Sequence, residues 1–370
     1  RTELELPEGR RGYPNSTTVD SWPWIFKEFR NHGYATLYSE DDAYYNAFNY
    51  RLHGFRDPPA DHYTRPFWQA ARTAGYCIKS TPQPQLHFDY VESFMKAYKN
   101  QPKIGLSFLA EISHSNMNTL SPTEGFVLNF FKSIQEKGYL NDTILITFSD
   151  HGMRFGEARA TMQSRLEERL PFLSITLPEI VRQRFPQLSD NLKANSNKLL
   201  SPFDIHATLR HVLNYPKNEP EKIGRSLFQS IPKDRSCAAC GIPVHYCPCV
   251  QLQKITTAHF HVQKAAEGLV AHLNKILNAD KLASQMCANL KLGEVRSAYQ
   301  NLNHPKLVKF VGSKDIDGRI PWFGNDTSDY ECNYQLLIKT VPGNGLFEVT
   351  TQLLDGKFHY GNEISRINKY

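Results

Sequence analysis

A short apolar run that stops at a cluster of polar residues constrains this chain more than any other stretch. Residues 143–148 read TILITF, the composition of a strand buried on both faces of a parallel sheet. The run ends abruptly at Ser149-Asp150-His151-Gly152. Open α/β sheets bind their ligands at the carboxyl ends of such strands. The stretch therefore predicts an α/β fold with a functional turn directly after this strand.

The chemistry of that turn points to a metal. Asp150 and His151 place a carboxylate oxygen next to an imidazole nitrogen, a pair that suits a divalent transition metal. Gly152 lets the backbone pass close to such an ion. Because calcium prefers shells made of oxygen alone, the imidazole favours Zn or Mn over Ca. The tripeptide by itself leaves a second interpretation open, an ordinary polar turn between a strand and a loop.

Strands and helices alternate over residues 22–215. Further strands are predicted at 34–39, 103–110 and 171–177, and helices at 22–31, 66–74, 86–99, 121–137, 179–184 and 201–213. Ser121 and Ser201 are typical helix caps, and Gly33 and Gly138 are typical helix ends. This alternation predicts a doubly wound, mostly parallel sheet with helices on both faces.

The character of the chain changes near residues 214–232. A cysteine cluster follows, then a long helix at about 257–277. Two strand-like runs, 334–340 and 346–354, flank a Pro-Gly-Asn-Gly turn and indicate a hairpin. We therefore expect an α/β core at 1–232 and a smaller α+β subdomain at 233–370.

Polar groups also follow two other predicted strands. Asp41 and Asp42 follow the first, and His114 closes the group that begins at Glu111. Carboxyl ends of parallel strands meet at one edge of a sheet, so these groups are expected to line the same pocket as Asp150. Asp41 and Asp42 then face the substrate or a metal, the alternative being a solvated turn. His114 would hydrogen-bond an anionic substrate, ligate a metal or protonate a leaving group, the alternative being a loop or core histidine.

Four arginines follow the turn, and each is able to hold a sulfate or phosphate through paired hydrogen bonds. A solvated helix face is the expectation for most of them. Arg154 and Arg159 lie nearest the turn and are the predicted substrate-binding pair; the others are Arg165 and Arg169.

Cysteines and glycosylation sequons together indicate an oxidising compartment, either outside the cell or in the secretory-pathway lumen. The sequons begin at Asn15, Asn141 and Asn325. Seven cysteines are present, and an odd count leaves one thiol over or bonded outside this segment. The clustered ones are predicted to form disulfides of unassigned connectivity: Cys237, Cys240, Cys247 and Cys249. A zinc site is the alternative, but Cys247-x-Cys249 is too closely spaced for the usual second ligand pair.

The charge distribution argues against two classes of partner. The net charge is +6, yet the longest basic run is Arg10-Arg11, so nothing resembles a nucleic-acid-binding stripe. No apolar run reaches the 18 residues that a membrane-spanning helix needs.

Several stretches resemble a known animal family, the domain of unknown function 229 family, in the sulfatase-like branch of the alkaline phosphatase superfamily. They are GYATLYSEDD at 33–42, FNYRLHGFRDPPADHYTRPFW at 48–68, ILITFSDHGMRFGEAR at 144–159, EERLPFLSITLP at 167–178, CAACGIPVHYCPC at 237–249 and ISRINKY at 364–370. The resemblance covers nearly the whole chain.

The resemblance implies a metal-dependent hydrolase of sulfate or phosphate esters, with its site above an α/β core. The metal-binding pair of that superfamily matches Asp150 and His151, and His114 is similar in position to a histidine that contacts the substrate anion. Superfamily members carry a first strand ending in a metal-binding acid, then a nucleophile at a helix start. Nothing in residues 1–38 resembles this strand or this nucleophile. The nucleophile is therefore expected upstream of Arg1, and little turnover is expected from these 370 residues.

Two functions from different classes compete. The first is the hydrolase-like protein, with an anionic ester, for example one carried on a glycan, as its substrate. The second is a non-catalytic extracellular domain of the same fold that binds glycans or proteins. A strand ending in Asp and a nucleophile upstream of Arg1 would favour the first.

Overall fold

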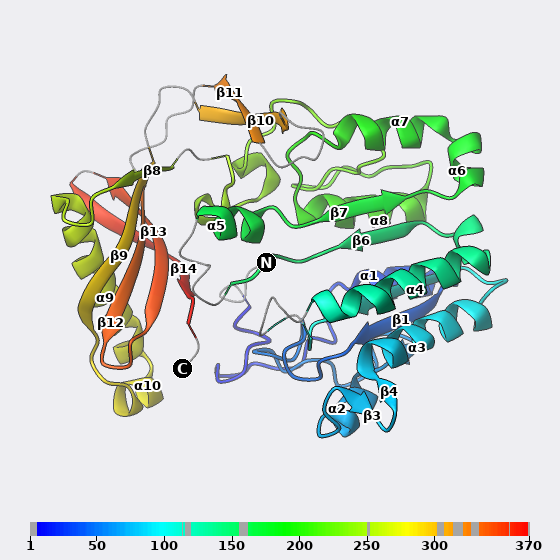
Figure 1. The fold of residues 1–370 in the computed structure, drawn as a ribbon, viewed down its shortest axis with the longest axis horizontal. Helices are drawn as coiled ribbons and strands as arrows, with labels where there is room; N and C mark the ends of the chain where they lie inside the picture. Colours follow the sequence, from blue (N-terminus) through cyan, green and yellow to red (C-terminus); the bar gives the residue numbers. More distant parts are fainter. Residues whose placement is uncertain are drawn as a thin grey trace. The chain divides into compact units, whose positions relative to one another are not determined.

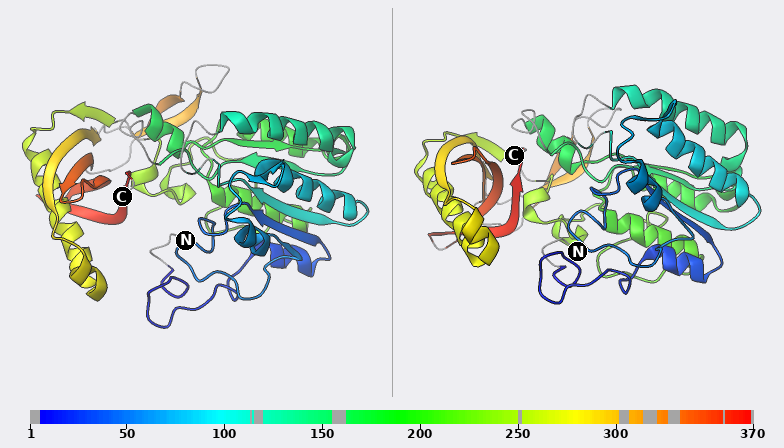
Figure 2. Two further views of the ribbon diagram at one scale, coloured as in Figure 1. Left: turned by 60° about the horizontal axis from the view of Figure 1, so that its bottom comes forward. Right: turned by 90° about the horizontal axis from the view of Figure 1, so that it is seen from below.

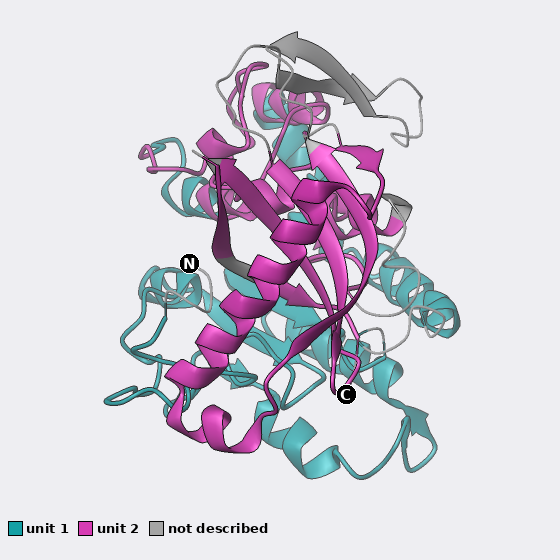
Figure 3. Ribbon diagram, turned by 90° about the vertical axis from the view of Figure 1, so that its left-hand side faces the viewer, with its two compact units in different colours: residues 1–146, 175–186, 209–218 teal, residues 147–174, 187–208, 219–370 magenta. Residues whose placement is uncertain are grey.

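The computed structural model describes residues 6–112, 114, 120–154, 162–249, 252–301, 307–313, 321–326, 333–354 and 356–368. It divides into two compact units, coloured separately in Figure 3. Unit 1 comprises residues 1–146, 175–186 and 209–218, and unit 2 comprises residues 147–174, 187–208 and 219–370. The units interleave along the sequence, and the division expected at 232/233 stays a prediction. Each unit is described separately.

Unit 1 is built on a three-stranded parallel sheet in the order β2-β1-β5. Strand β1 (Ala35–Glu40) lies between β2 (His62–Tyr63) and β5 (Lys103–Phe108). The strand predicted at 34–39 is confirmed, and all six residues of β1 are buried, as in a strand at the centre of a parallel sheet. The carboxyl ends of β1 and β5 coincide, because Glu40 is in register with Phe108.

Helices cover both faces of β1 (Figure 1). Phe26 and Phe29 of α1 (Ile25–Asn31) belong to the same core cluster as Tyr38, whereas Phe94 of α3 (Gln83–Ala97) belongs to the cluster of Leu37. Neighbouring residues of a strand point to opposite faces, so the two helices pack on opposite sides. The mixed α/β class is confirmed. The other elements of unit 1 are α2 (Arg65–Ala71), β3 (Cys77–Ile78), β4 (Thr81–Pro82), η3 (Ser121–Thr123), α4 (Glu124–Glu136), η4 (Tyr139–Asn141) and α6 (Glu179–Arg184).

The strand before the Asp-His turn differs from expectation. Strand β6 (Leu145–Phe148) forms a two-stranded sheet with β7 (Leu173–Thr176). Three of its residues are half-buried and Phe148 is exposed, so the expected burial on both faces is wrong. The physical reason is pairing: among the described strands β6 pairs with β7 and not with β5. The parallel sheet shown here is therefore small, and the larger doubly wound sheet stays a prediction.

Unit 2 is organised around a five-stranded antiparallel sheet in the order β14-β13-β12-β9-β8. Its strands are β8 (Leu252–Ile255), β9 (Lys291–Asn301), β12 (Asn333–Val341), β13 (Leu346–Leu354) and β14 (Lys357–Arg366). Pairing of β12 with β13 confirms the hairpin that the Pro-Gly-Asn-Gly turn predicts.

The long helix α9 (Phe260–Ala279) lies along one face of this sheet, as Figures 1 and 2 show. Its buried face packs on Leu336, Ile338 and Val349. The strand period of two turns Gln335 and Glu348 to the opposite face, where both are buried. The helix α8 (Pro202–Asn214) begins in unit 2 and ends in unit 1. The remaining elements of unit 2 are α5 (Met162–Arg169), α7 (Pro186–Asn195), η6 (Ala238–Cys240), η7 (Val244–Tyr246), α10 (Lys281–Met286) and the antiparallel pair β10 (Leu307–Ser313) and β11 (Pro321–Asp326).

None of the described helices combines the length and apolar character that crossing a bilayer requires.

Candidate metal centre

The Asp-His turn of unit 2 follows β6 directly and is held by backbone hydrogen bonds. The Ser149 N–H donates to the Phe172 carbonyl at 3.0 Å, and the Gly152 N–H donates to the Glu168 carbonyl at 3.4 Å. These two bonds fix the turn at both ends. The residues between them, Asp150 and His151, therefore project from a defined backbone.

Asp150 and His151 form a compact pair. Asp150 Oδ1 accepts the His151 N–H at 2.9 Å, which leaves Oδ2 3.2 Å from His151 Nε2. His151 Nδ1 lies 2.7 Å from the Gly152 carbonyl oxygen. A carbonyl only accepts hydrogen bonds, so Nδ1 carries a proton, and in the singly protonated ring Nε2 presents its lone pair. Metal-binding histidines characteristically donate their second N–H to a backbone carbonyl in this way.

The distance between the two side chains suits a shared cation. Two ligand atoms that bind one zinc ion at about 2.1 Å lie roughly 3.0–3.4 Å apart for angles between 90° and tetrahedral. The observed Oδ2–Nε2 separation of 3.2 Å falls in that range. A lone pair facing a carboxylate oxygen is repulsive unless a proton or a cation lies between them. The donor set therefore fits a divalent transition metal, for which Asp150 and His151 would supply two ligand atoms.

Gly152 is required at this turn by the helix beside it. A Cβ at position 152 would lie 2.6 Å from the Glu167 carbonyl oxygen, in the last turn of α5. No L-amino acid with a side chain fits that approach without a shift of backbone. From the sequence, Gly152 is expected to let the backbone pass close to an ion. In the structure, Gly152 is also needed for packing against α5.

The arginines that follow the turn are distributed differently from the prediction. Arg154 is exposed, and Arg159 lies outside the described residues. Arg165 and Arg169 were expected on a solvated face, but their side chains are only 1% and 6% exposed. That expectation is wrong because both contact the buried carboxylate of Glu348 in the sheet of unit 2.

Unit 1 carries a cluster of carboxylates at the carboxyl ends of β1 and β5. Asp41 Oδ1 accepts the N–H groups of Ala110 and Glu111 at 2.6 and 3.1 Å. Asp42 Oδ1 accepts the N–H groups of Tyr44 and Tyr45. Asp41 and Asp42 are both buried, so the solvated-turn alternative does not describe these side chains.

Burial perturbs these acids strongly. It raises the pKa of Glu40 and of Asp41 to about 7, and neighbouring carboxylates add to the increase. Burial and the Asp42 carboxylate also raise the pKa of Glu111. Crowded carboxylates with raised pKa values are characteristic of functional sites, although structural clusters show them too.

His114 lies in the same unit as this carboxylate cluster. Its N–H donates to the Ala110 carbonyl at 2.8 Å, and its ring stacks on Tyr45 with centroids 5.2 Å apart. The histidine is half-buried. His114, Asp41 and Asp42 thus belong to unit 1, whereas Asp150, His151 and Arg154 belong to unit 2. Their convergence on one pocket stays a prediction.

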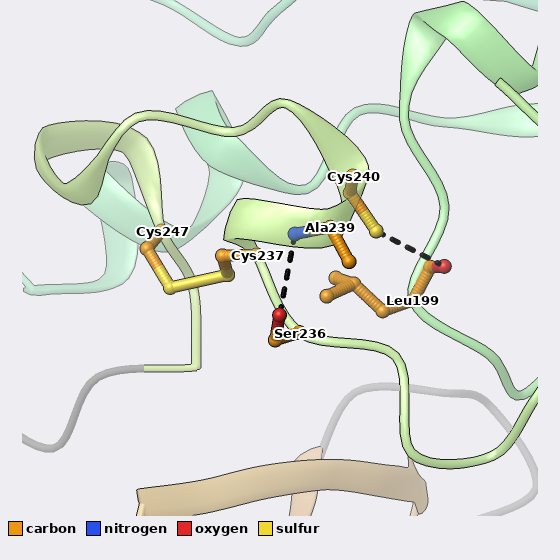
Figure 4. Close-up of a disulfide and its surroundings, with 6 residues drawn as sticks. All are labelled: Leu199, Ser236, Cys237, Ala239, Cys240 and Cys247. Carbon is orange, nitrogen blue, oxygen red and sulfur yellow. Dashed lines mark hydrogen bonds between the residues drawn. A yellow bond between two sulfur atoms is a disulfide. The ribbon is translucent and has the colours of Figure 1, made fainter. Parts of the chain in front are cut away.

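The cysteine cluster of unit 2 contains one disulfide, between Cys237 and Cys247, with Cα atoms 5.9 Å apart (Figure 4). Cys240 is a buried thiol whose S–H donates to the Leu199 carbonyl at 3.8 Å. Burial raises the Cys240 pKa to about 11. Cys249 is also a buried thiol, and its Sγ lies within 4.8 Å of both bonded sulfurs. The predicted disulfide is confirmed for one pair.

Two of the three sequons have exposed asparagines, Asn15 and Asn141. The Asn325 side chain lies outside the part of the chain that the structure describes. One functional candidate that sequence reasoning missed is Glu348. A glutamate in a strand carries no local signal of burial, and only its pairing with Arg165 and Arg169 reveals it.

Fold and site together define a mixed α/β protein with an Asp-His pair at a strand terminus that fits a divalent metal. The family model of the proteins of unknown function DUF229 matches residues 1–296. The chain therefore belongs to this family, as its sequence motifs predict. No curated protein and no solved structure matches the chain.

Proposed function

We propose that this protein is a metal-dependent hydrolase-like protein that acts on sulfate or phosphate esters. The observation that carries the proposal is the Asp150–His151 pair, in which the imidazole tautomer and the 3.2 Å Oδ2–Nε2 separation both suit a metal ligand pair. The fold proposed for the family is the doubly wound sheet of the alkaline phosphatase superfamily. The compartment proposed is outside the cell or in the secretory-pathway lumen, where the disulfide would be stable.

Each site residue has a proposed role. Asp150 and His151 would hold a transition metal, Zn or Mn in preference to Ca, and the bound ion would act as a Lewis acid toward the ester oxygen. Arg154 and Arg159 would bind the anionic group through paired hydrogen bonds. His114 would orient the ester or protonate its leaving group, and Asp41 and Asp42 would contact substrate. Stabilisation of negative charge by the metal and the arginines would be the main source of rate.

The test is metal content and hydrolysis, measured on the protein at its full natural length. We expect bound Zn or Mn and turnover of either an aryl sulfate or an aryl phosphate, and the preferred ester assigns the substrate class. Asp150→Ala and His151→Ala should each lose metal and turnover.

The chain offers a matched control for these variants. His206 and Glu221 form a second imidazole–carboxylate pair in unit 2, also 3.2 Å apart, but away from a strand terminus. His206→Ala should leave metal content and turnover unchanged. A folded, disulfide-intact wild type without metal or turnover would contradict the proposal and favour the binding-domain alternative.

A further inference from the structure

The turn that carries Asp150 and His151 rests on α5 of the same unit. Its Gly152 N–H donates to the Glu168 carbonyl at 3.4 Å, and the glycine leaves no space for a Cβ against Glu167. Contact this close means that a small displacement of the last turn of α5 must displace the Asp-His turn. The position of α5 therefore sets the position of the metal-binding pair.

Arg165 anchors α5 to the buried face of the antiparallel sheet. Its guanidinium donates to Gln335 Oε1 at 3.2 Å and to Ser297 Oγ at 3.3 Å. The same guanidinium stacks over the Tyr299 ring, 4.5 Å from its centroid. These partners lie on β9 and β12, so one side chain of α5 is held by two neighbouring strands.

Glu348 on β13 is the anion that compensates both arginines of α5. Its Oε1 lies 3.0 Å from Arg169 Nη2 and accepts the Gln335 amide at 2.8 Å. Its Oε2 lies 3.8 Å from Arg165 Nε. The Glu348 side chain is fully buried.

Such an arrangement is sensitive to the loss of one partner. Buried charges are tolerated when they are paired, and removing one member leaves an uncompensated charge in the core. Without Glu348, the nearly buried guanidiniums of Arg165 and Arg169 would both lose the carboxylate that they share. The easiest relaxation is movement of α5 away from the sheet. The Asp-His turn would then follow the helix.

We propose that Glu348 is a positioning residue for the Asp150–His151 metal pair and acts through Arg165, Arg169 and α5. This inference rests on the proposed function, because it gives Glu348 a role in metal binding. It assigns a task to the antiparallel sheet of unit 2, which would hold the metal-binding turn in its ligating geometry. Partners that orient metal ligands from outside the ligand shell typically change metal affinity by about 10–100-fold when they are lost.

The test compares Glu348→Gln with Glu294→Gln. Glutamine keeps the shape of the side chain and removes its charge. Glu294 lies on β9 of the same sheet, but it pairs with Arg296 at 2.9 Å with both side chains about half exposed. Two quantities are measured: hydrogen exchange of peptides that span residues 149–154, and Zn²⁺ affinity by titration calorimetry. We expect Glu348→Gln to speed the exchange and weaken Zn²⁺ binding roughly tenfold. Glu294→Gln should change neither.

Arg169→Lys keeps the test decisive if Glu348→Gln does not fold. It retains the positive charge but loses the forked geometry, and it should show the same two effects more weakly. Wild-type exchange and affinity in both variants would overturn the proposal, and so would faster exchange with unchanged affinity. A wild type that binds no Zn²⁺ would overturn the proposed function and this role of Glu348 with it. The exchange measurement needs no metal, so it would then show separately whether the sheet holds the turn.

Discussion

At the scale of single residues, Gly152 has a requirement that can be isolated by mutation. A Cβ there would lie 2.6 Å from the Glu167 carbonyl oxygen, with two more backbone atoms of α5 within 2.9 Å. We expect Gly152→Ala to lower the free energy of unfolding by about 1–3 kcal/mol, the usual cost of overpacking. Urea denaturation measures the change.

Gly125 supplies the control for this substitution. It lies in α4, and a Cβ there would meet nothing within 4 Å. Gly125→Ala should therefore raise the free energy of unfolding by about 0.5–1 kcal/mol, because alanine restricts the unfolded chain and favours helix. Equal effects of the two substitutions would show that close packing against α5 is not what position 152 requires.

Asp41 should make the stability of the protein depend on pH. Burial raises its native pKa to about 7, whereas an unfolded aspartate titrates near 3.9. Below about pH 4 both states are protonated. Between about pH 4 and 7 the native state holds a proton that the unfolded state has lost, so stability falls as pH rises and is constant above that window.

Asp41→Asn tests this dependence. Asparagine keeps an oxygen that accepts the Ala110 and Glu111 N–H groups but does not ionise. Relative to the wild type, the variant should gain roughly 2–4 kcal/mol of unfolding free energy between pH 4 and pH 8 in a metal-free buffer. Denaturant titrations at each pH measure the difference. The exposed Asp89→Asn is the control, and a pH profile parallel to wild type in Asp41→Asn would contradict the assignment.

Individual site residues were predictable to different degrees. Asp150 and His151 follow an apolar strand run, and the structure places both at the end of β6. Arg165 was not predictable, because its burial depends on a glutamate 183 positions further along the chain. Local patterns identify what a residue is able to do, whereas long-range pairing decides whether its charge is solvated.

At the scale of elements, the burial and disulfide pairing of the cysteines predict the order in which they react with a thiol reagent. Under native conditions a maleimide should label Cys77 and Cys287, which are exposed. Cys240 and Cys249 are buried, and the raised Cys240 pKa lowers its thiolate fraction, so both should react only after unfolding. Cys237 and Cys247 should react only after reduction.

Peptide mapping by mass spectrometry measures this order. Rapid native labelling of Cys240 would contradict the burial seen here. Release of zinc on unfolding without a reductant would favour the zinc interpretation of the cluster over the disulfide.

Elements defined by local signals were the best predicted. Gly33 and Gly138 have positive φ angles of 82° and 73° at the ends of their helices, as helix-stop glycines should. Before α8, the Ser201 N–H donates to Asp204 Oδ2 at 2.7 Å, so Asp204 supplies the capping side chain. The predicted cap through the Ser201 hydroxyl is wrong, because that hydroxyl has no hydrogen-bond partner among the described residues. The burial of β6 was mispredicted because the number of its neighbouring strands is not a local property.

At the scale of the whole molecule, each of the two units is assembled from three separate stretches of sequence. Within unit 2, Asp204 and Arg235 join two of these stretches through paired contacts of 2.8 Å, and both side chains are nearly buried. The predicted boundary lies where the cysteine-rich segment begins. It rests on a change in amino-acid composition, which carries no information on contacts between distant stretches of the chain. A division at 232/233 would separate Asp204 from Arg235.

Asp204→Asn tests how strongly this pair holds unit 2 together. The substitution leaves Arg235 nearly buried without its carboxylate, so we expect a loss of about 3–5 kcal/mol of unfolding free energy. Asp190→Asn, at an exposed position of α7, should change stability by less than about 0.5 kcal/mol. Thermal denaturation compares the two, and equal melting temperatures would contradict a stabilising role for the pair.

Calorimetric titration of the metal-free protein decides the claim that Asp150 and His151 bind a divalent metal. We expect Zn²⁺ or Mn²⁺ to bind in preference to Ca²⁺, and binding to weaken at least about a hundredfold in Asp150→Ala and in His151→Ala. His206→Ala should bind like the wild type. Binding that survives both substitutions, or no binding by the folded wild type, would contradict the claim.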